Sequence, residues 1–437
     1  MIVLKFGGTS VGSAQRMKDV ASLICNGKQK IVVLSAMSGT TNSLVEISNY
    51  LYKKNLTGAC EIISLLESKY YSLINDLHVN DENKKNSAEV VNRVFDDIRS
   101  FTAIENFTAV EEKKILAQGE LLSTGIFTNY LHEIGVNALL IPALDFMKID
   151  GNAEPDVNFI RKNVWATLEK YGKADVYITQ GFICRNAEGD IDNLQRGGSD
   201  YTASLVGAAV KAEEIQIWTD IDGMHNNDPR YVENTKPVAE LHFEEAAELA
   251  YFGAKILHPT CILPAKMENI PVRLLNTMDP KAPGTLISNR HIKGKIEAVA
   301  VKDGITAIQI TSSRMLLAYG FLRKVFEVFE KNKTAIDMIA TSEVGVSVSI
   351  DNNKYLEEIV DELKEFGTVS VDKNRVIICV VGDMDPENVG FHSKIINALK
   401  DIPIRMISFG GSNYNVSFLV KSEDKKRALV ALSNDLF

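Results

Sequence analysis

Short apolar runs alternate with stretches of helical hydrophobic spacing over the first part of the chain. The runs lie at residues 2–4, 31–34, 137–141, 175–179 and 215–219. Each run is apolar at consecutive positions, which is typical of strands that are buried on both faces. The alternation with helices predicts a parallel sheet covered by helices. We therefore expect an α/β domain with an open, mainly parallel sheet sandwiched by helices over about residues 1–290.

A polar segment interrupts this pattern. Between about residues 47 and 108 the sequence keeps a helical rhythm but loses the strand-like runs, which predicts a helical insertion. Residues 80–86 (NDENKKN) contain no apolar side chain, so we expect a solvated turn between two helices there.

The pattern changes again after residues 280–285 (PKAPGT), where proline and glycine punctuate the chain. Short alternating strands and amphipathic helices follow, and they repeat: IDMIA at 336–340 recurs as IRMIS at 404–408. We predict that residues 291–437 form two tandem α+β modules of βαββαβ type. Their expected limits are about 299–370 and 371–437, either in succession or interleaved.

Composition narrows the classes of protein. A chain of 437 residues with 45% hydrophobic and 24% charged residues is expected to fold into two or three domains. Its net charge of −9 argues against a partner of duplex nucleic acid. No apolar run approaches the roughly 18 residues that cross a bilayer, and the N-terminus lacks a signal core, so we expect a cytoplasmic protein without a membrane partner. Five scattered cysteines without a CxxC pair suggest neither disulfides nor a zinc site.

Two small turns follow the first two predicted strands. Residues 5–13 (KFGGTSVGS) open a helix, where free amides and the helix dipole favour an anion, and Lys5 adds a charge. Residues 35–42 (SAMSGTTN) repeat this arrangement after the next strand. Both turns would face one cleft, because ligands of open parallel sheets bind at the carboxyl ends of the strands. Each turn alone is also compatible with a plain connection or a helix cap, and neither common nucleotide-binding glycine motif is present.

Further polar segments are candidates for binding. Arg196 and Asp200 flank two glycines before a helix, where an arginine can hold a carboxylate with two hydrogen bonds or simply pair with the aspartate. Residues 219–230 carry alternating acids and Arg230, which suit ribose or phosphate contacts but also an ordinary polar loop. Lys255 lies on an otherwise apolar helix face. Glu120 lies in the segment QGELLS, where a glutamate would be an exposed helix residue in most proteins.

Together these segments resemble the aspartokinases of the amino-acid kinase family. The motifs that carry the resemblance follow the order of that family: KFGGTSV at 5–11, QGE at 118–120 with Ser123, QGF at 180–182, RGGSD at 196–200, WTDIDG at 218–223, DPR at 228–230 and GAKILHP at 253–259. The C-terminal repeat is similar to the pair of ACT regulatory modules of those enzymes. The resemblance is closest to the lysine-sensitive type without a fused dehydrogenase.

The resemblance implies transfer of a phosphoryl group from MgATP to the β-carboxylate of L-aspartate. The product would be 4-phospho-L-aspartate, the first intermediate toward lysine, threonine and methionine. A carboxylate with a pKa of about 3.9 is already ionised at neutral pH, so this nucleophile needs no general base. The remaining problem is repulsion between two anions, which lysines and backbone amides reduce. A glutamate kinase or an amino-acid sensor without catalysis are the alternatives.

The resemblance also implies roles for individual residues. The catalytic set would be Lys5, Gly7, Gly8 and Asp200. The aspartate site would comprise Thr41, Glu120, Phe182, Arg196, Gly197 and Gly198. The ATP site would comprise Lys5, Ser10, Thr219, Asp220, Arg230 and Lys255. We expect Mg²⁺ to be held by phosphates and water, and we predict no protein side chain as its ligand.

Regulation is implied by the ACT modules. Residues that match the inhibitor-binding stretch of the lysine-sensitive type are Met315, Gly320, Phe321, Leu322, Asp337, Thr341, Ser342 and Glu343. L-Lysine is therefore the expected allosteric inhibitor, although Ala318 replaces a serine that is common in that type and leaves the identity of the inhibitor open. ACT modules from two subunits would pair across a two-fold axis, giving a homodimer or a tetramer.

Overall fold

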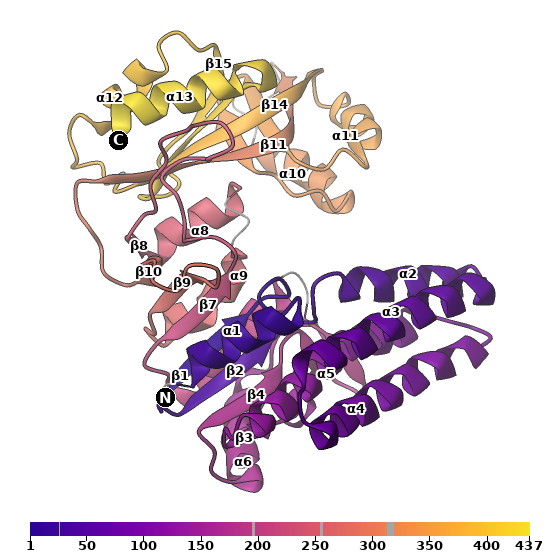
Figure 1. The fold of residues 1–437 in the computed structure, drawn as a ribbon. Helices are drawn as coiled ribbons and strands as arrows, with labels where there is room; N and C mark the ends of the chain where they lie inside the picture. Colours follow the sequence, from indigo (N-terminus) through magenta and orange to yellow (C-terminus); the bar gives the residue numbers. More distant parts are fainter. Residues whose placement is uncertain (26, 195–196, 254–256, 313–318) are drawn as a thin grey trace. The chain divides into compact units, whose positions relative to one another are not determined.

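The structure is a computed structural model that describes residues 1–25, 27–194, 197–253, 257–312 and 319–437. The chain forms two units. Figure 1 shows the ribbon coloured by position along the sequence. The first unit comprises Met1–Gly223 and Ile256–Asn289, and the second comprises Met224–Lys255 and Arg290–Phe437. The sequence assigns residues 224–253 to the catalytic domain, whereas the structure groups them with the second unit. The limits of the catalytic domain stay a prediction.

A sheet forms the centre of the first unit, with neighbouring strands in the order β3-β4-β2-β1-β7-β9-β10. The strands are β1 (Ile2–Phe6), β2 (Lys30–Leu34), β3 (Ala138–Leu140), β4 (Val176–Gln180), β7 (Ile215–Thr219), β9 (Val272–Asn276) and β10 (Thr285–Ser288). All neighbours are parallel except β9 and β10. The predicted mainly parallel sheet is confirmed, and each of the five apolar runs forms a strand in it.

Helices cover this sheet. They are α1 (Ala14–Ile24), α2 (Thr40–Tyr52), α3 (Leu56–Leu77), α4 (Asp81–Ser100), α5 (Ala109–Glu133), α6 (Val157–Tyr171), α7 (Gly198–Val210) and α9 (Pro259–Met267), with short 3-10 turns at Phe101–Ala103 and Ala143–Asp145. A hairpin of β5 (Ile183–Arg185) and β6 (Ile191–Asn193) precedes α7. The polar segment after residue 47 is helical as predicted, because α3 and α4 bury one apolar stripe each against α2 and α5.

The prediction of a solvated turn over residues 80–86 is wrong. Asn80 is the N-cap of α4, and its side chain accepts hydrogen bonds from the amides of Glu82 and Asn83. Residues 81–86 already belong to the helix, where Asp81 and Glu82 interact favourably with the positive end of the helix dipole. The polar run is therefore the capped first part of a helix and not a break between helices.

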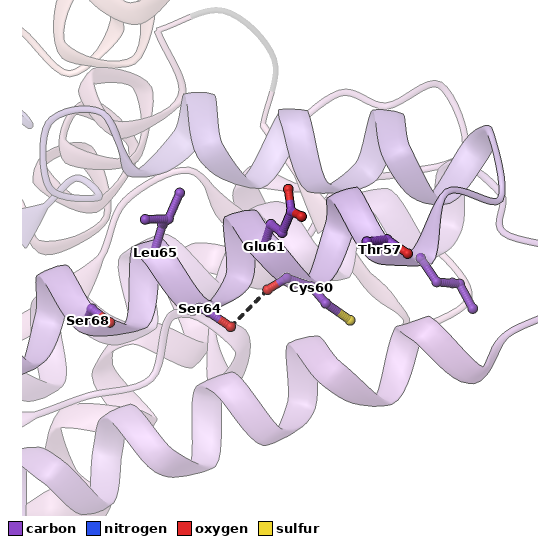
Figure 2. A pocket seen from close by; sticks show the side chains of 7 residues that line it. Thr57, Cys60, Glu61, Ser64, Leu65 and Ser68 are labelled. Atoms are coloured by element: carbon purple, nitrogen blue, oxygen red, sulfur yellow. Dashed lines mark hydrogen bonds between the residues drawn. The ribbon is translucent and has the colours of Figure 1, made fainter.

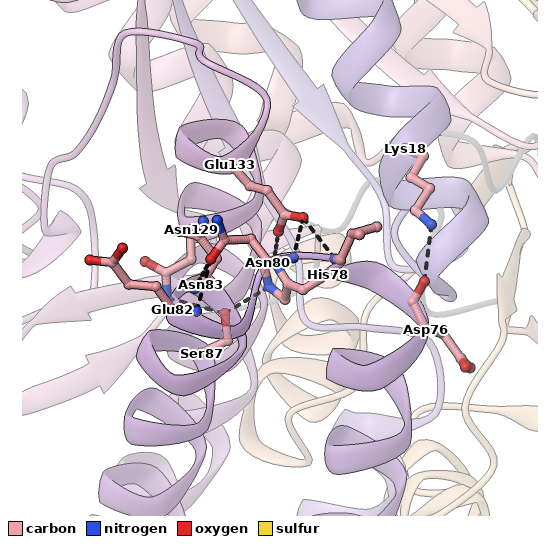
Figure 3. Close-up of polar contacts among 10 residues, drawn as sticks. Lys18, Asp76, His78, Asn80, Glu82, Asn83, Ser87, Asn129 and Glu133 are labelled. Carbon is pink, nitrogen blue, oxygen red and sulfur yellow. Dashed lines mark hydrogen bonds and ion pairs between the residues drawn. The ribbon is translucent and has the colours of Figure 1, made fainter.

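A buried polar network fixes the end of α3 and the start of α4 to the end of α5 (Figure 3). His78 follows α3 and is 2% exposed; its Nδ1 pairs with Glu133, and its Nε2 lies 2.9 Å from the hydroxyl of Ser87. Glu133 also accepts the amide of Val79 at 2.7 Å. Burial would raise the pKa of Glu133, but the hydrogen bonds from His78 and the backbone outweigh it and lower that pKa. These contacts hold the end of α3, the start of α4 and the end of α5 together.

The second unit contains a six-stranded antiparallel sheet in the order β12-β13-β11-β14-β16-β15. Its strands are β11 (Ile296–Thr311), β12 (Met338–Thr341), β13 (Gly345–Ile350), β14 (Thr368–Gly382), β15 (Ile404–Ser408) and β16 (Asn415–Lys421). Its helices are α10 (Phe321–Lys331), α11 (Leu356–Leu363), α12 (Phe391–Ala398) and α13 (Lys425–Leu436), with a 3-10 turn at Ser422–Asp424. Strand β8 (Glu240–His242) and helix α8 (Phe243–Tyr251) complete the unit.

The two longest strands join the repeats. The second half of β11 pairs with β13 and with the start of β14. The first half of β11 pairs with the end of β14, and the end of β14 also pairs with β16. Shifts in the β11–β14 register between Lys302 and Ala307 separate the two halves of β11. Each repeat has its own apolar core, and β11 contributes Ile308 to one core and Val299 to the other. The predicted α+β repeats are thus present and share strands.

In the described part of the chain, every helix is too short or too polar to cross a bilayer.

We predict that Glu133→Gln lowers the melting temperature at pH 7 by roughly 2–6 °C, because one charged hydrogen-bond acceptor contributes about 1–3 kcal/mol. The folded pKa of Glu133 lies below its ordinary value of 4.5, so its contribution exists above that value and is lost as the pH falls further. The difference from wild type should shrink in that acidic window. Thermal melts against pH test this, with exposed Glu89→Gln as control; a difference that stays constant down to pH ~3 contradicts it.

Candidate active site

The end of β1 places a lysine at the carboxyl edge of the sheet. Lys5 Nζ lies 2.7 Å from Oδ1 of Asp200, which stands in the first turn of α7, and the two side chains are 12% and 13% exposed. The hydrogen-bonded neighbours of β1 on both sides, β2 and β7, fix the direction of the strand. The sequence-predicted pair is therefore brought together, with an ammonium group held beside the turn that begins at Gly7.

The two predicted glycine turns pack against each other. The Ser38 amide donates a 3.0 Å hydrogen bond to the carbonyl of Gly8. A Cβ atom on Gly8 would lie 2.7 Å from the carbonyl oxygen of Ala36, closer than side chains approach backbone atoms. Glycine is required here by the contact between the turns, and not only by the path of the chain. The expectation that both turns face one cleft is met.

A cleft of about 400 Å³ lies between these turns. Its lining residues are Gly8, Thr9, Ser35, Ala36, Met37, Ser38, Gly39, Thr41, Asn42, Glu120, Phe182, Gly198 and Ser199. Five of them come from the catalytic and aspartate-binding sets predicted from the sequence: Gly8, Thr41, Glu120, Phe182 and Gly198. They arrive from segments up to 190 residues apart, and the structure brings them to one place.

Glu120 is the buried acid of this cleft. It stands on α5, is 5% exposed, and accepts a 3.0 Å hydrogen bond from the amide of Ala36. Burial raises the pKa of Glu120 to about 8, although the Ala36 amide and the charge of Lys5 act in the opposite direction. The reading of Glu120 as an exposed helix residue is thereby excluded. Gly119 allows this approach, because a Cβ there would lie 2.7 Å from that of Ala36.

Phe182, which also lines the cleft, has an uncommon backbone conformation. Its φ is +67°, in the left-handed region that non-glycine residues rarely adopt. The conformation is held by a hydrogen bond from its amide to Thr202 Oγ1 at 3.1 Å and by one from the Leu194 amide to its carbonyl at 2.7 Å. A Cβ on Gly198 would lie 2.7 Å from the Phe182 ring. Such strain is typical of binding sites, and the sequence gives no sign of it.

A chain of hydroxyl groups links the ends of β1, β7 and β9. Ser10 is fully buried, and its Oγ lies 2.7 Å from that of Thr277, which donates to the carbonyl of Thr219 at 2.9 Å. The Thr219 hydroxyl in turn lies 3.2 Å from Asp220 Oδ1. Thr277 was missed in the sequence, although it directly follows the apolar run of β9. The predicted ATP-binding residues Ser10, Thr219 and Asp220 thus belong to one edge of the sheet.

Other predicted site residues are placed differently. Arg230 belongs to the second unit, where its guanidinium group contacts both carboxylate oxygens of Asp228 at 2.7 to 3.2 Å and is 73% exposed. Gly197 is the N-cap of α7 with φ +71°. Arg196, Lys255 and Met315 lie outside the described residues.

The residues predicted for the inhibitor lie in the first ACT-like repeat. Gly320 is the N-cap of α10 with φ +79°, Phe321 packs in the core, and Leu322 is 37% exposed. At the end of β12, Thr341 and Glu343 are exposed.

Two further residues of this set make local contacts. The amide of Ser342 donates to the carbonyl of Gly345 at 2.8 Å. Asp337, in contrast, has a buried side chain that forms an ion pair with Lys302.

A larger hollow, of about 840 Å³, lies on α3 and is shown in Figure 2. All seven lining residues belong to that one helix, and none is a predicted site residue. Among the described residues, no group of three or more His, Cys, Asp or Glu side chains is arranged to hold a metal ion. The cleft at the two glycine turns is therefore the candidate active site.

Comparisons with known proteins agree on the family. The amino acid kinase family model matches residues 1–276, and an ACT domain model matches residues 378–436. Aspartokinase 1, chloroplastic, of Arabidopsis thaliana is 34% identical over 100% of this chain and 80% of its own length. Lysine-sensitive aspartokinase 3 of Escherichia coli is 31% identical over 100% of this chain and 99% of its own length.

Solved structures show the same likeness. E. coli aspartokinase III in complex with aspartate and ADP superposes with a TM-score of 0.85 at 30% identity and covers 100% of both chains. The aspartate kinase of Clostridium acetobutylicum gives a TM-score of 0.86 at 26% identity, also over 100% of both chains.

We predict that Glu120→Gln becomes more stable relative to wild type as the pH rises from 4.5 to about 8. The folded pKa of this acid is raised, so the native state holds a proton that the unfolded state releases, and wild type loses stability across that window. Glutamine keeps the acceptor for the Ala36 amide but does not titrate. Thermal melts of the ligand-free proteins measure this, with exposed Glu105→Gln as control. A difference in melting temperature that does not depend on pH would show that Glu120 titrates normally.

Proposed function

Because this chain belongs to the aspartokinases of the amino acid kinase family, we propose that it phosphorylates the side-chain carboxylate of L-aspartate with ATP. The products are 4-phospho-L-aspartate and ADP. The observation that carries the proposal is the Lys5–Asp200 ion pair beside a cleft whose wall holds the buried carboxyl group of Glu120. The E. coli relative was solved with aspartate and ADP, which is the ligand pair that this cleft chemistry suits.

Lys5 supplies the charge that the reaction needs. The aspartate side chain is ionised at neutral pH and attacks without a general base, but it must approach a polyphosphate of the same sign. An ammonium group between the two anions lowers that repulsion most in the transition state, where charge spreads over the transferred phosphoryl oxygens. Asp200 holds Lys5 Nζ in place until substrate oxygens compete for it. The Gly7 amide donates to the carbonyl of Trp218 at 3.3 Å and so belongs to the sheet. Gly8 lines the part of the turn against which those oxygens would lie.

Glu120 suits the α-ammonium group of aspartate. In the free protein the carboxyl group has a pKa of about 8 and is mainly protonated at neutral pH. A bound ammonium group favours the ionised form, so binding of the substrate and ionisation of Glu120 stabilise each other. Arg196 would hold the α-carboxylate, and Thr41, Phe182, Gly197 and Gly198 would shape the surrounding wall. This arrangement leaves the β-carboxylate directed toward Lys5.

ATP would bind at the adjoining edge of the sheet. Thr219 and Asp220 follow β7, and Ser10 supports them through Thr277. Arg230 and Lys255 are proposed as further nucleotide contacts from residues 224–255. Mg²⁺ would accompany the phosphates; the carboxylates of Asp200 and Asp220 already have partners, which favours a metal held by phosphates and water.

Regulation by L-lysine is proposed through the ACT-like repeats. A lysine-sensitive relative matches the full length of the chain, and a crystal structure of E. coli aspartokinase III holds lysine and aspartate. Thr341, Ser342 and Glu343 are placed near the exposed end of β12, where a second subunit could complete the site in a homodimer or tetramer. We place the enzyme in the cytoplasm, where ATP and aspartate are available.

Lys5→Ala is predicted to reduce turnover roughly 10²–10³-fold, because it removes a preorganised charge from the reacting phosphoryl group. The measurement is aspartyl hydroxamate formation that depends on both ATP and aspartate. Exposed Lys162→Ala, on α6 of the same unit, is the matched control and should retain wild-type turnover. Near-normal turnover of the Lys5 variant would refute the assigned role.

Thr341→Ala and Glu343→Ala are each predicted to weaken inhibition by L-lysine, because both side chains are exposed at the proposed effector site. The same assay, titrated separately with lysine, threonine and methionine, gives the concentration for half inhibition relative to each variant's own uninhibited rate. Exposed Glu357→Ala on α11 is the control. Unchanged lysine inhibition in both variants contradicts the proposed site, and inhibition by threonine or methionine alone would assign a different effector.

A further inference from the structure

Asp337 differs from the other residues predicted for the inhibitor, because its carboxylate is already engaged. The residue directly precedes β12, and its side chain is only 1% exposed. Oδ1 accepts a hydrogen bond from Lys302 Nζ at 2.6 Å and another from the hydroxyl of Tyr251 at 2.8 Å. Oδ2 is buried and has no hydrogen-bond partner among the described residues. One oxygen is thus doubly used, while the other remains free to accept a donor.

Lys302 is held by the groups that recognise a free alkylammonium ion. Its Nζ lies between Asp337 and Asp351, with Asp351 Oδ2 at 2.9 Å, and it stands 4.3 Å from the centroid of the Tyr251 ring. Two carboxylates and an aromatic face form a binding site for a primary ammonium group. Burial would lower the pKa of Lys302, but the two carboxylates raise it, so the side chain stays charged.

We propose that Lys302 is an internal stand-in for the ammonium group of the effector, and that the effector binds Asp337 by displacing Lys302, which keeps its ion pair with Asp351. This inference rests on the proposed inhibition by lysine and names the step that precedes it. The chemistry fits, because the side chain of Lys302 and that of free L-lysine end in the same group. Asp351 is 41% exposed and can keep the displaced ammonium group solvated and paired.

Tyr251 connects this exchange to the segment of the chain that leads to Lys255. It is the last residue of α8, and Gly253 follows two positions later at the start of the GAKILHP motif. Gly253 has φ +132° and lies so close to β11 that a Cβ atom there would stand 2.1 Å from the carbonyl oxygen of Val301, the residue before Lys302. A change of partners at Asp337 would therefore move Tyr251 close to the tight contact between Gly253 and Val301. The segment after this junction contains Lys255, which is proposed to contact ATP.

Two substitutions test the displacement, and their expected effects have opposite signs. Lys302→Met removes the internal competitor, so the lysine concentration for half inhibition should fall roughly tenfold, as expected for one charge-assisted contact. Asp351→Asn removes the partner that receives the displaced group, so that concentration should rise about threefold. Lys331→Met is the matched control, because Lys331 pairs with Glu362 at 2.9 Å in the same repeat but contacts neither Asp337 nor Tyr251. Each titration is run at substrate concentrations scaled to the variant's own KM.

Tyr251→Phe tests the connection and does not depend on the folding of the Lys302 variant. It keeps the ring beside Lys302 and removes only the hydroxyl donor to Asp337. In wild type, lysine is expected to raise the KM for ATP; in this variant the ratio of KM with and without lysine should move toward one.

The outcomes separate the inference from the proposed function. Absence of aspartate kinase activity in wild type would contradict the proposed function. Active wild type without lysine inhibition would contradict the proposed regulation and this inference with it. Lysine inhibition that is unchanged in Lys302→Met and Asp351→Asn would overturn the inference alone, as would a higher concentration for half inhibition in Lys302→Met.

Discussion

Repulsion between a carboxylate and a polyphosphate is the constraint on which this active site depends. A cation must stand between the two anions, and it must be placed before they arrive. The protein meets this need with Lys5 at the end of a central strand, whose neighbours on both sides fix its position. Asp200 keeps the ammonium group oriented in the absence of substrate. Since the whole chain carries a net charge of −9, such cations have to be concentrated where the substrates bind.

Close packing of glycines determines the shape of the cleft around Lys5. Gly8 and Gly119 both approach Ala36, from the first turn and from α5, so that the second turn is held from two sides. Gly198 packs against the Phe182 ring in a similar manner. Any Cβ at these positions would force the walls apart, and the distance between Lys5 and Glu120 would change with them. The charges and the glycines are therefore parts of one arrangement.

The sequence predicts much of the fold because strands buried on both faces leave an unmistakable pattern. The five apolar runs of the first unit all form strands of its sheet, and the repeated IDMIA and IRMIS segments lie at equivalent edge positions. The prediction was wrong over residues 80–86, where polarity reflected exposure and not a break in the helix. Local composition cannot separate these two cases, because the exposed first turn of a helix and a loop are both rich in polar residue types.

The site was harder to predict, because its properties arise from contacts between distant segments. Glu120 acquires its raised pKa only when α5 buries it against Ala36. Thr277 becomes part of the site through Ser10, 267 residues away in the sequence. The contact of Tyr251 with Asp337 likewise joins two segments that are 86 residues apart. The resemblance to a family supplied the names of site residues, and the structure supplies their partners.

The most direct test of the account is trapping of the acyl phosphate with hydroxylamine, using the wild-type chain, ATP and either L-aspartate or L-glutamate. Aspartyl hydroxamate should form together with an equal amount of ADP. Glutamate, which is longer by one methylene group, should react roughly 10 to 200 times less efficiently in kcat/KM. Equal or faster reaction of glutamate, or ADP formation without any hydroxamate, would contradict it.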